Sequence, residues 1–167
     1  MPSERVHDAA TTARYATHDQ PLTGYGVLAA SFLGGAGAFA VWLARSGRPI
    51  PDRVELADLA LVSIAAHKAS RLLAKDRVTS VVRSPFARRR SAATAGEVED
   101  AARGLGLRRA VGELLVCPYC LGMWMAAALT ASLLVVPRFT RWIAVVLTAV
   151  TIADFLQIAY RKALDTL

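Results

Sequence analysis

Two cysteines three residues apart, Cys117 and Cys120, are the residues of this sequence with the most direct chemical potential. Pro118 suits the first position of a helix, which would place Cys117 at the helix cap and Cys120 one turn further on. Unpaired amides and the helix dipole at that end favour a thiolate. Such a pair can exchange with disulfides or offer two soft ligands to a metal ion.

Three interpretations of the cysteine pair remain open at this stage. The thiols can be reduced and serve packing. We favour this interpretation because the charge distribution described below predicts a cytoplasmic position for the pair, and thiols in the cytoplasm are kept reduced. They can belong to a zinc or iron site, which needs four ligands and would be completed by Glu113, Asp76, His67 or a second copy of the chain. In the third interpretation the protein is a thiol-disulfide oxidoreductase, with Cys117 as the nucleophile and Cys120 as the resolving thiol.

The composition decides which kind of element must position these thiols. Counted with glycine and without tyrosine, apolar residues make up roughly 58% of the 167 residues, against about 45–50% in soluble proteins. The formal net charge is nevertheless +7. An apolar chain with two cysteines is neither disordered nor a disulfide-stapled secreted scaffold, so we expect an integral membrane protein.

Three apolar runs are long enough to cross a bilayer as helices, at residues 25–44, 121–136 and 142–160. A fourth run, 54–74, is interrupted by ionisable residues near its two ends. These are Glu55, Asp58, His67, Lys68 and Arg71. We expect this run to span the membrane inside a helical bundle, and the alternative is an amphipathic helix lying on the surface.

The distribution of Lys and Arg predicts the orientation. With four spans, thirteen basic residues fall on the side of the N-terminus, the 75–120 loop and the 161–167 tail, against five on the opposite side. The positive-inside bias therefore places the loop and the C-terminus in the cytoplasm of a multi-pass protein of the bacterial inner (plasma) membrane.

The basic loop predicts contact with a polyanion. Its arginines follow a membrane helix at the level where anionic lipid head groups gather, so we expect lipid or a protein partner to be bound there. These arginines are Arg71, Arg77, Arg83, Arg88, Arg89 and Arg90. We do not expect nucleic acid, because the loop has almost no interleaved aromatic residues and no recognition motif.

Ionisable residues at membrane depth are expected to pair with one another. Asp154 lies as far from the predicted cytoplasmic end of its span as Lys68 lies from the end of its own. We therefore predict an ion pair of Asp154 with Lys68 or Arg71. A proton or ion pathway through Asp154 and His67, in a small transporter or channel, is the alternative.

The loop itself has several predicted local features. Asp76 caps a helix that begins at Arg77, and Arg83 pairs with Asp76. Residues 87–96 form a flexible basic linker, and residues 97–116 form an amphipathic helix on the cytoplasmic surface, with acidic residues in its first turn. Residues 1–20 are predicted to be a disordered polar tail.

Two segments carry a resemblance to a known family. They are Arg71-Leu72 followed by Asp76-Arg77-Val78-Thr79 and Arg83-Ser84-Pro85-Phe86, and Gly112-Glu113-Leu114-Leu115-Val116-Cys117-Pro118-Tyr119-Cys120-Leu121-Gly122-Met123-Trp124. Their order and spacing resemble a family of small bacterial and phage-borne membrane proteins of unknown function, some of them sporulation-associated. The resemblance covers about residues 54–160 and implies fold and location but no reaction.

These observations predict an all-α integral membrane bundle of four transmembrane helices plus a cytoplasmic amphipathic helix. No nucleotide loop, hydrolytic triad or carboxylate pair at a recognisable spacing indicates a classical enzyme. We expect a structural or interaction protein that binds anionic lipid, a protein partner or a second copy of itself.

Overall fold

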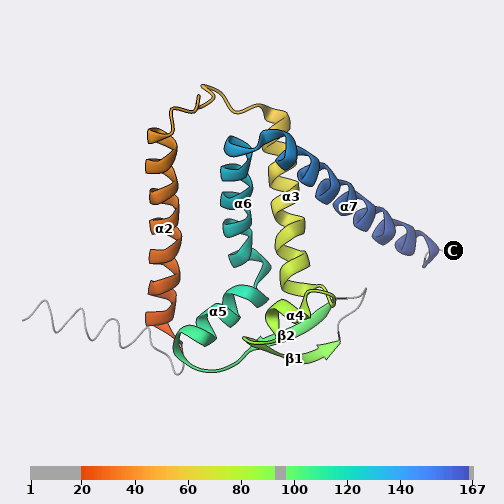
Figure 1. Ribbon diagram of the computed structural model, residues 1–167. Helices are drawn as coiled ribbons and strands as arrows, with labels where there is room; N and C mark the ends of the chain where they lie inside the picture. The colour runs from red at the N-terminus through yellow and green to blue at the C-terminus, as the bar shows by residue number, and fades with distance from the viewer. Residues whose placement is uncertain (1–19, 93–96, 166–167) are drawn as a thin grey trace, which may run out of the picture.

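The computed structural model describes residues 20–92 and 97–165, and it is mostly helical (Figure 1). The predicted tail at 1–20 and residues 93–96 of the predicted linker lie outside the described residues, apart from Gln20. In chain order the elements are α2 (Leu22–Arg45), α3 (Leu56–Lys75), α4 (Ser80–Arg83), β1 (Ala87–Ala92), β2 (Val98–Ala102), α5 (Gly106–Val116), α6 (Pro118–Val135) and α7 (Pro137–Leu164).

The four long helices alternate in direction (Figure 1). Helices α2, α6 and α3 stand side by side, whereas α7 leans away from them toward the C-terminus. Helix α4, the two strands and α5 close one end of the row, and we call this part, residues 76–92 and 97–116, the charged cap. The sequence range expected for each long helix falls on α2, α3, α6 and α7, with ends that differ by a few residues.

The core lies where α3 packs against α6 and α7. Its most buried side chains are small, including Ala65, Ala66 and Ala144, together with Leu121. Small side chains allow helix backbones to approach closely, which is how helices gain packing energy in a lipid environment. The sequence of α3 therefore supports close contact on two sides at once.

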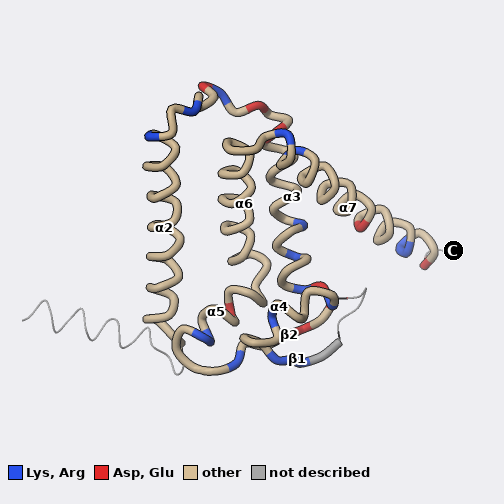
Figure 2. Tube along the Cα trace, viewed as in Figure 1, with Lys and Arg blue, Asp and Glu red and all other residues tan. Residues whose placement is uncertain are grey.

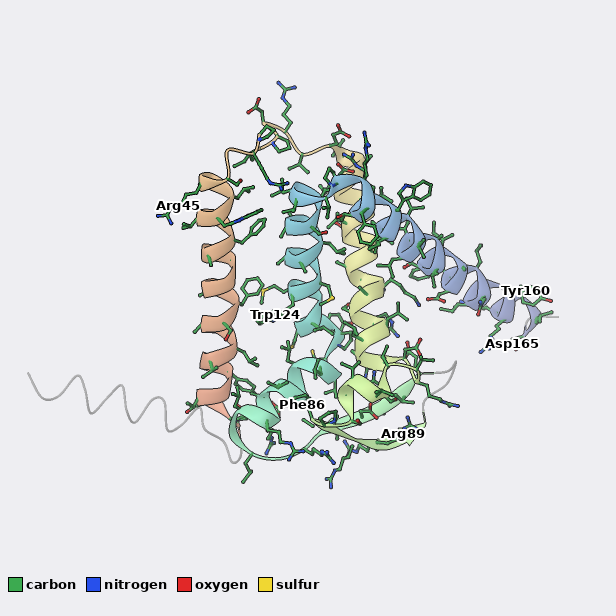
Figure 3. The ribbon with its side chains drawn as sticks, viewed as in Figure 1. Arg45, Phe86, Arg89, Trp124, Tyr160 and Asp165 are labelled. Atoms are coloured by element: carbon green, nitrogen blue, oxygen red, sulfur yellow. The ribbon has the colours of Figure 1, made fainter. Side chains whose placement is uncertain are left out.

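Helix α2 is attached to the rest of the protein at few points. Near its start, a side chain on Gly24 would meet Ala110 Cβ of α5 at 2.7 Å, so only glycine permits this approach. Further along, the rings of Phe32 and Trp124 meet edge to face with centroids 5.1 Å apart. Figure 3 shows Trp124 in the space between α6 and α2. Most other side chains of α2 point outward.

Three of the long helices, α2, α6 and α7, are long and apolar enough to cross a membrane by length and composition. This is consistent with a membrane protein. Helix α3 does not meet the same criterion within the described residues, so the fourth predicted span is not established by composition.

The charged cap contains a small antiparallel sheet, and the expectation of an all-α fold is wrong there. Strands β1 and β2 pair from Ala87 opposite Ala102 to Ala92 opposite Val98, with an irregularity between Arg89 and Ser91. The helix predicted over 97–116 begins only at Gly106, and the linker predicted over 87–96 is a strand as far as Ala92.

The physical reason for this difference is burial combined with a backbone turn. Val98 and Ala87 are buried beneath the helices, which an exposed linker or a surface helix would not achieve. Gly104 has a φ of 88°, a left-handed conformation that ends the strand and separates it from α5.

Candidate functional site

The cysteine pair lies where the charged cap passes into α6. Cys117 is the N-cap residue of α6, Pro118 occupies the first turn, and the Cys120 amide donates a hydrogen bond to Cys117 Sγ at 3.3 Å. Both thiols are free, with Cys117 half-buried and Cys120 exposed. The predicted position of the pair at a helix start is thus observed.

The surroundings of Cys117 favour its thiolate. Burial raises the pKa of the Cys117 thiol, but hydrogen bonds from the Cys120 thiol and from the Cys120 and Tyr119 amides lower it, as does the positive charge of Lys75. The lowering contributions prevail, so the pKa of Cys117 lies below its ordinary value. Chemically, the pair presents one activated thiol with a second thiol as its hydrogen-bond donor.

A metal site within one chain is not assembled from the expected ligands. Glu113 accepts hydrogen bonds from Tyr25 and Arg109, and the Asp76 carboxylate accepts one from the Val78 amide. Among residues 20–92 and 97–165, no three His, Cys, Asp or Glu side chains lie together as metal ligands would. Glu113 and Asp76 thus have partners within the protein, and a zinc or iron site stays a prediction.

Arg83 holds the charged cap together. Its side chain is 1% exposed, and Nε lies 2.8 Å from Asp100 Oδ2 on β2. Nη1 donates to the Leu73 carbonyl at 2.6 Å and to Thr79 Oγ1 at 2.7 Å, and Nη2 donates to the Asp76 carbonyl at 2.8 Å. One buried guanidinium thus joins the end of α3, the turn before α4 and strand β2.

This network corrects two expectations for the segment from Asp76 to Arg83. Arg83 has no surface left for a lipid head group, because it is buried and bonded inside the cap. Its ionic partner is Asp100, and it contacts Asp76 only through the backbone carbonyl. Asp76 does bond the Val78 amide, but the helix begins at Ser80, not at Arg77.

The remaining arginines of the predicted binding set divide into two groups. Arg71 forms an ion pair with Glu97 at the edge of the cap, so its charge is partly neutralised. The others are exposed, and Figure 3 shows Arg89 extending from the hairpin. This exposed group consists of Arg77, Arg88, Arg89 and Arg90. Figure 2 shows the concentration of basic residues over the cap.

Gly112, a residue of the segment that resembles the known family, lies where α5 approaches the sheet closely. A side chain on Gly112 of α5 would lie 2.5 Å from the Phe86 carbonyl oxygen and 3.0 Å from Ala102 Cβ. Only glycine lets α5 rest directly on the end of the sheet. Glu113, one residue on, pairs with Arg109 one turn earlier in α5 and accepts a hydrogen bond from Tyr25 of α2.

Two ion pairs join α3 to α7. Lys68 Nζ lies 2.5 Å from Asp154 Oδ2, so the structure brings together the pair expected from equal depth, whereas Arg71 lies with Glu97 instead. Arg141 also forms a two-pronged pair with Asp58, at 2.8 and 2.7 Å. The sequence analysis missed this second pair, although the same depth argument applied to the other ends of the two helices would have found it.

His67 does not join Asp154. It follows a different line along α3 from Lys68, because consecutive helical residues point about 100° apart, and its side chain is exposed. Among residues 20–92 and 97–165, Asp154 has its ion pair with Lys68 and no hydrogen bond with His67, and the pathway stays a prediction.

Comparison with known proteins gives a family match over most of the helices described above. Residues 61–160 match the model of a family described as "Protein of unknown function (DUF1360)". The chain belongs to this family. It is also 30% identical over 110 residues to "Sporulation protein YjcA" of Bacillus subtilis (strain 168), an alignment that covers 64% of this chain and 93% of that protein. No solved structure matches.

The matched range of the DUF1360 family runs from the first half of α3 into α7. It contains the Arg83 network, the cysteine pair and the Lys68–Asp154 ion pair. Helix α2 lies before it. The resemblance stated from the sequence is thereby confirmed: the family is uncharacterised, and a relative is named as a sporulation protein.

Proposed function

We propose that this protein is a four-span protein of the bacterial plasma membrane whose charged cap lies in the cytoplasm and binds anionic lipid head groups. In this proposal α3 is the fourth span. Its 20 residues reach about 30 Å at 1.5 Å per residue, the thickness of a bilayer core. It runs antiparallel beside α6 (Figure 1), and its charges at Asp58 and Lys68 are neutralised by α7.

The proposed topology has two supports: the charges give the orientation, and the aromatic residues support only the spanning of the membrane. Most basic residues lie at the end of the bundle that carries the charged cap, which the positive-inside bias assigns to the cytoplasm (Figure 2). Aromatic residues also lie near both ends of the spans, as at membrane interfaces. Trp42 and Trp142 lie near the end opposite the cap, and Tyr25 and Tyr119 lie near the cap.

The observation that carries the head-group proposal is the division among the six arginines of the predicted binding set. Arg83 and Arg71 have acidic partners within the protein. Arg77 and the run Arg88 to Arg90 are exposed in the charged cap. Each basic residue near an anionic surface contributes about 1 kcal/mol of attraction. Such a cluster fits a structural or interaction role better than it fits catalysis.

The test is retention of anionic lipid by purified full-length protein. Protein reconstituted with phosphatidylglycerol and phosphatidylcholine is re-extracted in mild detergent, and the lipids that remain bound are quantified. Replacing Arg88, Arg89 and Arg90 together by Gln should lower retained phosphatidylglycerol without changing phosphatidylcholine. The matched control replaces Arg45, Arg53 and Arg138, three exposed arginines at the opposite end. The proposal would be contradicted if the two triple variants retained the same amount of phosphatidylglycerol.

A second candidate function rests on the lowered pKa of Cys117. As a thiol-disulfide oxidoreductase, Cys117 thiolate would attack a substrate disulfide, form a mixed disulfide and release one substrate thiolate. Cys120 would then attack Cys117 Sγ, close the Cys117–Cys120 disulfide and release the second substrate thiol. The Cys120→Ser variant should accumulate mixed disulfides in cells, and complete absence of adducts with both thiols reduced would contradict this candidate.

A further inference from the structure

Helix α4 and the turn before it present an apolar surface that no other part of the described chain covers. Val78, Val81 and Val82 are 83%, 80% and 52% exposed. Arg83, the last residue of α4, is buried on the opposite side of this segment. A short segment with a buried arginine on its inner side and three valines exposed on its outer side is the reverse of what contact with water favours.

Hydrogen bonds place α4 at the level where α3 ends. Thr79 Oγ1 donates to the Leu72 carbonyl, and Arg83 Nη1 donates to the Leu73 carbonyl at 2.6 Å. Both carbonyls belong to the last turn of α3, which ends at Lys75. In the topology proposed above, that turn leaves the hydrocarbon core, so α4 lies at the boundary between acyl chains and head groups.

We propose that α4 is a membrane-inserting wedge. Val78, Val81 and Val82 enter the acyl chains of the cytoplasmic leaflet, and Arg77 and the hairpin arginines stay at the level of the lipid phosphates. The combination of a small apolar surface with a basic rim is complementary to an anionic leaflet. The wedge rests on the topology in the proposed function, but it does not require that the arginines select anionic lipid.

The experiment uses full-length protein in nanodiscs, in a Cys117→Ser/Cys120→Ser background. A single cysteine at Val81 carries an environment-sensitive fluorophore, and the matched control carries it at Glu99, an exposed residue of β2 in the same cap. Each sample is measured with iodide in the water and with a lipid bearing a nitroxide high on its acyl chain. Nanodiscs contain either phosphatidylcholine alone or a mixture with phosphatidylglycerol.

Insertion predicts a shorter emission wavelength for the Val81 label, strong quenching by the nitroxide lipid and loss of quenching by iodide, whereas the Glu99 label shows the reverse. The proposal would be overturned if iodide quenched the Val81 label as strongly as it quenches the Glu99 label. It would also be overturned if neither quencher reached the Val81 label, which indicates a protein partner. A label at Val78 repeats the test. Quenching of the Val81 label by the nitroxide lipid in both nanodisc types supports the wedge even when replacement of the arginines leaves phosphatidylglycerol retention unchanged. The two proposals therefore fail separately.

Discussion

Helices α2 and α3 are of similar length but have opposite characters. The residues of α2 are apolar or small until Arg45, and most of its side chains are exposed. Helix α3 carries Asp58, Lys68 and Arg71, but it lies at the centre of the packed helices. The helix with the stronger apolar composition is thus the one with the fewer contacts.

This contrast shows what composition measures in such a protein. Apolar side chains are required where a helix meets lipid, and most side chains of α2 are exposed on the described part of the protein. A helix covered by its neighbours can hold charges if each charge finds a partner, as Asp58 and Lys68 do on α7. The apolar composition of a helix therefore indicates how much of its surface can face lipid. Packing against neighbouring helices decides whether a helix with charged residues can cross a membrane.

The largest expected effect comes from the arginine that closes the end of α3. Arg83→Gln leaves Asp100 and four other acceptor oxygens without their guanidinium partner, and should lower the free energy of unfolding by about 3–5 kcal/mol. Arg77→Gln removes the same charge from an exposed position of the cap, and should change it by less than about 0.5 kcal/mol. Unfolding in mixed micelles measures both. Equal effects would show that burial of Arg83 is not what stabilises the cap.

The ion pairs of α3 provide the next test. Asp154→Leu leaves Lys68 unpaired at membrane depth, which should destabilise the protein by at most about 2.5–3.5 kcal/mol. Adding Lys68→Leu should restore most of the loss, because an apolar pair replaces an ion pair at little cost. A double variant as unstable as the single one would contradict the view that α3 tolerates charge only through its partners.

A smaller and local effect is expected where α2 meets α5. Gly24→Val places a branched side chain against Ala110 and should separate α2 from the bundle without changing the unfolding of α3 to α7 by more than about 0.5 kcal/mol. The matched control is Gly35→Val, because a Cβ at Gly35 meets nothing within 4 Å.

The readout for these α2 variants is the yield of a short bismaleimide cross-link between cysteines placed at Phe32 and Trp124, in the background without Cys117 and Cys120. Gly24→Val should lower the yield, and Gly35→Val should leave it unchanged. Equal yields from both variants would show that the Gly24 contact does not hold α2.

The smallest effect concerns the thiol beside the end of α3. Because the pKa of Cys117 is lowered, the thiolate is present at lower pH than in free cysteine, and the rate of alkylation should rise through a midpoint below that of free cysteine. Lys75→Gln removes a positive charge that favours the thiolate and should move the midpoint upward. Mass spectrometry of Cys117 after timed alkylation measures both midpoints. A midpoint at or above the ordinary value would contradict the assigned surroundings.

Much of the helical arrangement was predictable from the sequence. Long apolar runs specify membrane-length helices, and the equal depth of Lys68 and Asp154 predicted which residues would meet. The hairpin was not predictable, because Glu97, Glu99 and Asp100 have the charge pattern of a helix start and the pairing of β1 with β2 depends on burial of Val98. The role of Arg83 depends on carbonyls at the end of α3 and on Asp100, seventeen residues away, which no local pattern reveals.

The central claim, that α3 crosses the membrane, is tested most directly by the sidedness of its two flanks. In the Cys117→Ser/Cys120→Ser background, single cysteines at Arg53 and at Glu99 are treated with a membrane-impermeant maleimide in sealed right-side-out and inside-out membrane vesicles. A spanning α3 predicts that the Arg53 position reacts only in right-side-out vesicles and the Glu99 position only in inside-out vesicles. Reaction of both positions in the same vesicles would contradict the four-span account and place α3 on the membrane surface.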